Sequence, residues 1–139
     1  MTGSANIDRT PLLGGRVTLF QPADGYRAAI DPVLLAAAVP AVAGERVLEL
    51  GCGTGAALLC LAARVPDLTV TGLEVQEIAA GLARRGAMES GLEQRVAVLD
   101  GDLAALPSDL RPNSFDHVLA NPPFRSEEHT SELQSLRHL

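Results

Sequence analysis

The sequence predicts an α/β fold in which a parallel sheet is covered by helices. Short, apolar, β-rich runs alternate with longer segments rich in Ala and Leu, which is the pattern of repeated βα units. Apolar residues make up 47% of the chain, and such a composition suits a sheet buried on both faces. The 139 residues are enough for one domain and too few for two.

Four strands are expected, at residues 46–50, 68–74, 96–99 and 116–120. Helices are predicted between them at residues 55–64 and 76–90, the second ended by Gly91 as a C-terminal cap. An earlier helix should begin at Asp31-Pro32, because Asp accepts hydrogen bonds from free N–H groups and Pro fits the first helical position, and should end at Pro40. Residues 106–114 are expected to form a loop.

Charge and cysteine content exclude several classes of protein. A net charge of −6 argues against non-specific coating of nucleic acid, which depends on Lys and Arg neutralising phosphates. Cys52 and Cys60 lie too far apart for a CxxC motif, so neither a metal site nor a disulfide framework is indicated. No signal peptide or membrane-spanning run is recognised, and a cytoplasmic location is expected. All basic residues are Arg, which we attribute to codon usage.

A glycine-rich loop follows the first predicted strand of the sheet. Gly51, Gly53 and Gly55 allow a sharp turn and a close approach to a ligand, and the next helix offers unpaired N–H groups. The spacing also satisfies the dinucleotide pattern G-x-G-x-x-G/A, and Glu74 ends the second strand where that fold places its ribose-binding acid. The glycines alone therefore leave a nicotinamide cofactor and S-adenosylmethionine both open.

The next two strand ends favour the second cofactor. Asp102 follows the third strand, and Asn121-Pro122-Pro123-Phe124 follows the fourth, at the edge where open α/β sheets bind ligands. This combination resembles the class I S-adenosylmethionine-dependent methyltransferases, especially those that methylate exocyclic or amide nitrogen. The resemblance implies a Rossmann-like fold with a truncated parallel sheet, made of the first four strands only.

The resemblance also implies roles for individual residues. The cofactor-binding residues would be Glu49, Gly51, Cys52, Gly53 and Gly55 around the methionine part, Glu74 at the ribose hydroxyls, and Asp102 with Leu103 at the adenine. Capping of a helix or turn is the structural alternative for Asp102. Residues 25–36 are in addition similar to the segment that opens bacterial tRNA adenine-N6 methyltransferases, so tRNA is the expected partner, with no metal and no membrane.

Asn-Pro-Pro-Phe suits methylation of an aromatic amine. The Asn121 side-chain oxygen and the Pro122 carbonyl would accept the two N–H groups and free the nitrogen lone pair, while Pro122 and Pro123 fix the backbone. Phe124 would stack on the base. An enzyme that methylates N5 of glutamine in a translation factor would use the same motif. A non-catalytic nucleotide-binding module or an NAD-dependent oxidoreductase is the alternative from another class.

The composition changes after Phe124. Residues 125–139 contain no Ala, Gly or Val and resemble a translated sequencing adapter, although a genuine short helix is also compatible with them. We therefore expect an N-terminal segment at 1–30, a cofactor-binding domain at 31–124 and a non-native tail at 125–139. On this interpretation the chain is a fragment of a methyltransferase and is itself inactive.

Overall fold

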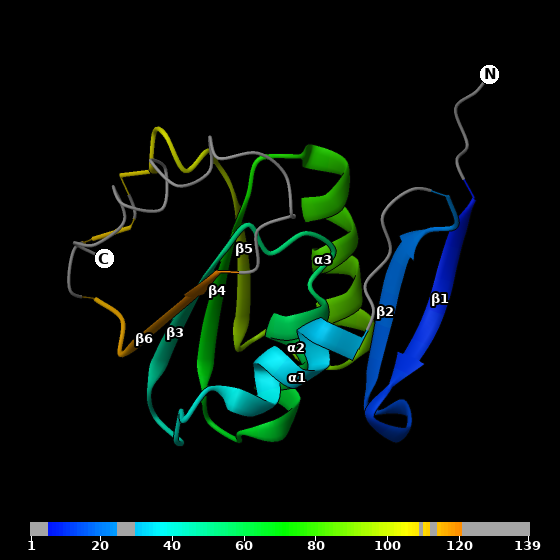
Figure 1. Cartoon of the computed structure of the whole chain (residues 1–139), viewed down its shortest axis with the longest axis horizontal. Coiled ribbons are helices and arrows are strands. Elements are labelled where there is room, and N and C mark those ends of the chain that lie inside the picture. The colour runs from blue at the N-terminus through cyan, green and yellow to red at the C-terminus, as the bar shows by residue number, and fades with distance from the viewer. Residues whose placement is uncertain (1–5, 25–29, 109, 112–113, 121–139) are drawn as a thin grey trace.

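The computed structural model describes residues 6–24, 30–108, 110–111 and 114–120, with the side chains of residues 30 and 31 left out. In chain order the elements are β1 (Ile7–Leu12), the 3-10 turn η1 (Leu13–Gly15), β2 (Val17–Pro22), α1 (Ile30–Ala38), β3 (Arg46–Leu50), α2 (Ala56–Arg64), β4 (Thr69–Glu74), α3 (Glu77–Glu89), β5 (Val96–Asp100) and β6 (His117–Ala120) (Figure 1).

The main sheet has four parallel strands in the order β5-β4-β3-β6. The four strands expected from the sequence are confirmed, each to within one residue at either end. β3 is an inner strand of the sheet. It pairs with β4 on one side and with β6, the last strand in the sequence, on the other (Figure 1). This arrangement brings the carboxyl ends of β3, β4 and β6 to one edge.

Alternate residues of β3 belong to different cores. Val47 packs with the buried side chains of the three helices, in a cluster that includes Leu58 and Leu59 of α2. Leu48 and Leu50 pack with Leu73 in a second cluster, together with partly buried residues from the segment that follows β5. Successive side chains of a strand point to opposite faces, so the sheet is covered on both faces by the described residues, as its apolar sequence predicts.

The parallel sheet has the four strands expected, and a separate two-stranded sheet precedes it in the chain. The segment predicted as an unassigned N-terminal region contains β1 and β2, which pair antiparallel from Ile7↔Pro22 to Leu12↔Val17. This hairpin packs on α3: the Thr18 N–H donates to Ser90 Oγ at 2.9 Å, and the Arg85 guanidinium lies 4.0 Å from the centroid of the buried Phe20 ring. The hairpin is therefore held by tertiary contacts with a helix about 70 residues further along the chain.

The helix ends test the expected caps. α3 ends as predicted: Gly91 has a left-handed φ of 71°, its N–H donates to the Met88 carbonyl at 3.1 Å, and the Leu92 N–H donates to the Ala87 carbonyl at 2.8 Å. These two bonds form a Schellman motif. α1 begins at Ile30, one residue before the expected start, and ends at Ala38, two residues before Pro40.

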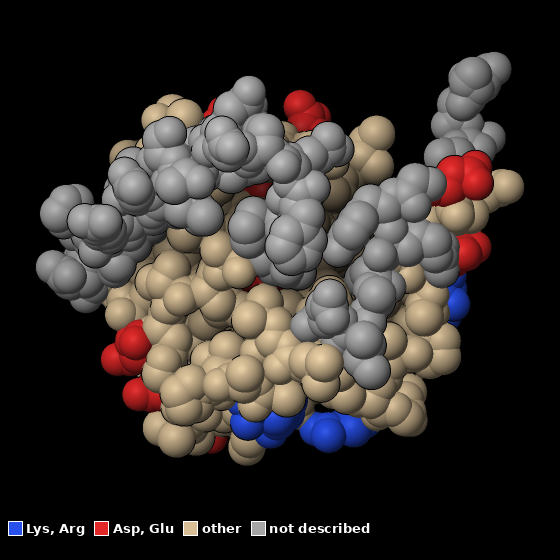
Figure 2. All heavy atoms as spheres, in the orientation of Figure 1, with Lys and Arg blue, Asp and Glu red and all other residues tan. Residues whose placement is uncertain are grey.

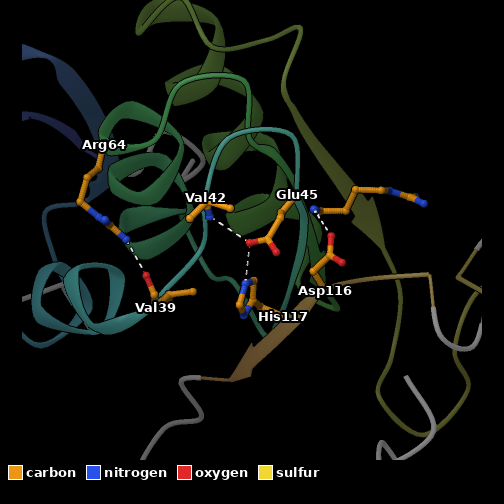
Figure 3. Close-up of polar contacts among 7 residues, drawn as sticks. Val39, Val42, Glu45, Arg64, Asp116 and His117 are labelled. Carbon is orange, nitrogen blue, oxygen red and sulfur yellow. Dashed lines mark hydrogen bonds and ion pairs between the residues drawn. The ribbon is translucent and has the colours of Figure 1, made fainter.

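Arginine side chains close the carboxyl ends of α1 and α2. The Arg95 guanidinium donates to the carbonyls of Ala62, Val65 and Leu68 at 2.9, 3.2 and 2.9 Å. Arg64 donates to the Val39 carbonyl at 2.7 Å (Figure 3) and to that of Ala36 at 3.2 Å. Basic atoms gather along the lower edge of the molecule in Figure 2, below α1 and α2. A planar guanidinium carries five N–H donors in a fixed fork, which suits contacts with several carbonyls at once.

Polar contacts attach the start of β6 to the start of β3 (Figure 3). The Arg46 N–H donates to the Asp116 carboxylate at 2.9 Å, and the Asp116 N–H donates to the Arg46 carbonyl at 2.8 Å. His117 Nε2 lies 2.9 Å from Glu45 Oε1, which also accepts the Val42 N–H at 2.9 Å. The Val42 N–H, and after it His117, lower the pKa of Glu45 from its ordinary value.

Candidate functional site

The site lies where β3 turns into α2. Gly51, Gly53 and Gly55 all have left-handed backbone angles, with φ of 69°, 58° and 94°. Gly55 is also crowded, since a Cβ there would lie 2.9 Å from Leu58 Cδ2 and 3.2 Å from Ala83 Cβ. A side chain at these positions would be strained, so the glycines are required by the path of the loop itself.

Backbone contacts with β4 fix the start of the loop. The N–H groups of Gly51 and Cys52 both donate to the Leu73 carbonyl, at 2.8 and 3.1 Å. The buried carboxylate of Glu74 accepts the Gly53 N–H at 2.7 Å and the Gln76 N–H at 3.0 Å. Glu74 is thus brought against the loop, as the sequence predicts. Each carboxylate oxygen keeps a further acceptor position, so these bonds leave room for a ligand's hydroxyl groups.

Glu49 supplies a second buried carboxyl group at the same place. It is 1% exposed, and its Oε1 has no hydrogen-bond partner among the residues that the structure describes. Burial, and then the nearby charge of Glu74, raise the pKa of Glu49 to about 8, while the Leu58 N–H opposes this shift. Glu49 is therefore mostly protonated at neutral pH, which removes the cost of an unpaired buried charge.

Cys52 is held as a thiol rather than a thiolate. Its side chain is 6% exposed, and burial, followed by the charges of Glu49 and Glu74, raises the pKa of the thiol. A nucleophilic role requires the thiolate, so Cys52 is a packing residue of the loop.

Gly72, in the interior of β4, is a residue of the site that the sequence analysis missed. A Cβ at Gly72 would lie 2.7 Å from Cys52 Sγ, 3.0 Å from Cys52 Cβ and 3.1 Å from Leu58 Cδ1. The absent side chain therefore makes the space that Cys52 fills. A glycine in the interior of a predicted strand is the signal that would have found it, because such a glycine often marks a close approach.

The segment after β5 carries Asp102 and Leu103. Asp102 is exposed, its Oδ1 accepts the Ala104 N–H at 3.0 Å, and its backbone forms an isolated bridge with Ala105. These contacts agree with the turn-capping alternative for Asp102. Leu103 is partly buried against the cluster of Leu48, Leu50 and Leu73. The adenine-binding role of both residues stays a prediction.

The expected amine-binding motif, Asn121-Pro122-Pro123-Phe124, lies outside the described residues. β6 nevertheless ends beside the glycine loop, because Ala120 pairs with Leu50, the residue before Gly51. The tail at 125–139 also lies outside the described residues. The part of the chain that is described contains no group of three or more side chains suited to hold a metal ion, and no helix there is long and apolar enough to cross a membrane.

The family model for the methyltransferase small domain matches residues 28–137, a range that extends into the segment of changed composition. Two relatives carry the name tRNA1(Val) (adenine(37)-N6)-methyltransferase. The one from Porphyromonas gingivalis is 36% identical over 126 residues, covering 86% of this chain and 49% of its own length. The one from Bacteroides thetaiotaomicron is 33% identical over 108 residues, covering 77% of this chain and 44% of its own length. The chain thus spans about half the length of the curated relatives it matches.

Solved structures share the fold. TrmN from Thermus thermophilus has a TM-score of 0.58 and 34% identity, over 73% of this chain and 29% of that protein. A methyltransferase from Thiobacillus denitrificans in complex with S-adenosylhomocysteine has a TM-score of 0.55 and 29% identity, over 66% of this chain and 36% of that protein.

Proposed function

The chain belongs to the methyltransferase small domain family, and we propose that it forms the S-adenosylmethionine-binding part of an enzyme that methylates the exocyclic N6 amine of an adenine in tRNA. The observation that carries the proposal is the geometry of the glycine loop. Its backbone is fixed by hydrogen bonds to β4 and to the Glu74 carboxylate, and each Glu74 oxygen can accept one more hydrogen bond. The names of the relatives support tRNA as the substrate class.

The charge of the site supports S-adenosylmethionine over a nicotinamide dinucleotide. A dinucleotide would bring a negatively charged pyrophosphate to the glycine loop, whereas S-adenosylmethionine brings a sulfonium and an ammonium group. Glu49 and Glu74 are both buried there; a carboxylate disfavours an anion, and a protonated carboxyl can ionise only beside a cation. Solved neighbours that are methyltransferases agree with this choice.

We assign the cofactor contacts by position along the loop and the strand ends. Glu74 accepts the ribose hydroxyls, and Asp102 with Leu103 faces the adenine. The methionine part lies against Glu49, Gly51, Cys52, Gly53 and Gly55. Glu74 already accepts two backbone N–H groups with its two oxygens, and this fixes its orientation before a ligand arrives.

Asn121, Pro122, Pro123 and Phe124 would hold the target amine. The lone pair of an adenine amine is delocalised into the ring, and hydrogen bonds from its N–H groups to Asn121 and Pro122 would localise it on nitrogen. S-Adenosylmethionine, when bound, would supply the methyl group: the nitrogen would bond to the methyl carbon as the carbon–sulfur bond breaks, and a proton would pass from the nitrogen to water. Alignment of the amine with the methyl carbon supplies about 7–11 kcal/mol, compared with about 1–3 kcal/mol for stacking on Phe124. Position at Asn121 therefore dominates the rate.

We favour tRNA, and hence the cytoplasm, over a glutamine in a translation factor. Both relatives are named for tRNA, although the Asn-Pro-Pro-aromatic motif alone fits either substrate. The net charge of −6 means that the overall charge of the chain does not favour phosphate binding.

Isothermal titration of the chain with S-adenosylhomocysteine and with NAD tests the cofactor assignment. Binding of the first and not the second is expected, and preference for NAD would overturn it. Transfer of labelled methyl groups to unmodified tRNA by the complete enzyme tests the chemistry, with Asn121→Ala as the variant that should retain cofactor affinity and lose transfer. Equal labelling by wild type and variant would contradict the role of Asn121. Labelling of a transcript whose target adenine is replaced by guanine would contradict the assignment of that adenine as the target.

A further inference from the structure

Glu49 is a buried acid whose environment in the free protein is unfavourable for a charge. It is 1% exposed, and Oε1 lacks a hydrogen-bond partner among the described residues, although a carboxylate normally accepts several. It lies two residues before Gly51, on the face of β3 that carries α2. An unpartnered oxygen at this position is available to a ligand that enters the glycine loop.

The groups that face Glu49 explain why it holds a proton. Glu74 of β4 is a second buried carboxyl, and Cys52 in the loop is an uncharged thiol. Among the described residues, the Leu58 N–H of α2 is the dipole that favours the carboxylate form of Glu49. Its register partners on the neighbouring strands, Gly72 and Leu119, do not titrate. The described surroundings therefore stabilise the neutral acid over the carboxylate.

A cation placed beside Glu49 would reverse this balance. An unpaired buried carboxylate is costly, but one next to a positive charge and shielded from water is strongly favoured. S-Adenosylmethionine carries two positive groups on the part assigned to this loop, the sulfonium and the α-ammonium. Resting on the proposed function, we infer that the site exchanges a proton for a cation: Glu49 releases its proton to solvent when the positively charged part of S-adenosylmethionine binds beside it.

The exchange has a measurable size. With the pKa of Glu49 at about 8 in the free protein, about 0.9 proton is released per site at pH 7 if the bound state is fully ionised. The dissociation constant should then fall about tenfold for each unit of pH between roughly 6 and 7.5, and level off above about pH 8. A ligand bound without this exchange would show no such slope.

Titration calorimetry at pH 7 in two buffers, phosphate and Tris, measures the released protons, because the two buffers differ in their heat of ionisation. Glu49→Gln mimics the neutral acid and should bind with no Glu49 proton released and with a flatter pH profile. Exposed Glu93→Gln is the matched control and should release protons as the wild type does. Any proton exchange of the ligand's own amine is common to all three proteins and cancels in the comparison.

The outcomes separate this inference from the proposed function. Binding by wild type with the same proton count as Glu49→Gln would overturn the exchange and leave the cofactor assignment intact. Absence of binding to S-adenosylmethionine at every pH would overturn both. If S-adenosylhomocysteine, which keeps the ammonium and lacks the sulfonium, also releases the proton, the ammonium is the partner of Glu49. Release with S-adenosylmethionine alone identifies the sulfonium.

Discussion

Replacing Gly72 by Ala should destabilise the protein, although the same change in the exposed interior of α3 should stabilise it. The new Cβ would lie 2.7 Å from Cys52 Sγ, where non-bonded heavy atoms normally stay about 3.5–4.0 Å apart. Rotation of the thiol cannot relieve the crowding, because Cys52 Cβ is at 3.0 Å and Leu58 Cδ1 at 3.1 Å. Leu58 is fully buried, and the Cys52 N–H is bonded to the Leu73 carbonyl.

The size follows from two opposing effects. Overpacking in a filled core costs about 1–3 kcal/mol, whereas the lower entropy of Ala in the unfolded chain contributes about 0.4–1 kcal/mol in favour of folding. Packing wins because Cys52 Cβ cannot move without its backbone and Leu58 is fully buried. Gly72→Ala should therefore lower the free energy of unfolding by about 1–2 kcal/mol.

Urea unfolding followed by far-ultraviolet circular dichroism measures this difference. Gly81→Ala is the matched control: no atom lies within 4 Å of its added Cβ, and helix propensity predicts a gain of about 0.5–1 kcal/mol. Adding Cys52→Ala removes the 2.7 Å contact and keeps the one at 3.0 Å, so Gly72→Ala should cost less in that background. A Gly72→Ala protein as stable as the wild type would refute the reasoning, as would an equal loss in Gly81→Ala.

Three further substitutions test the polar contacts. Arg95→Ala leaves three carbonyls without their donor and should lower the free energy of unfolding, measured by urea titration, by about 2–4 kcal/mol. Arg95→Lys should recover only part of this loss. Full recovery by Lys would contradict the role of the planar guanidinium. The raised pKa of Glu49 makes the folded state hold a proton that the unfolded state has lost, so stability should fall as pH rises from about 5 to about 8, and Glu49→Gln should flatten that profile in unfolding titrations. The lowered pKa of Glu45 has the opposite effect on stability. Ionised Glu45 stabilises the folded state above the ordinary pKa of 4.5, and this stabilisation is lost as pH falls through the lower folded pKa. Glu45→Gln should therefore lose less stability than wild type on acidification from about pH 5 to about pH 3.

The sequence predicted the main sheet because its strands are locally distinct. Each is a short apolar run between glycines, prolines or polar residues, and the buried pattern of β3 is uninterrupted from Val47 to Leu50. The β1–β2 hairpin lacks such a signal. β1 contains Asp8, Arg9 and Pro11, which are poor strand formers, and what stabilises β2 is packing on α3 that no local pattern reveals.

The candidate site was predictable in its backbone and less so in its electrostatics. Glycine spacing and Glu74 at a strand end were sufficient to place the loop and its carboxylate together. The protonation of Glu49 depends on burial by α2 and on the proximity of Glu74, both of which arise only when β3 and β4 pair. The role of Gly72 likewise depends on contact with Cys52 across the sheet.

The pairing of β6 with β3 has a consequence for how the chain folds. Arg46 and Asp116 are 70 positions apart, and α2, β4, α3 and β5 all lie between them. During synthesis β3 can pair with β4 early. The other edge of β3 can pair with β6 only after the segment around residue 120 has left the ribosome. Closing so long a loop is slow because its entropy is lost before the new contacts form. We therefore expect chaperones to bind the folding intermediate in which one edge of β3 is still unpaired.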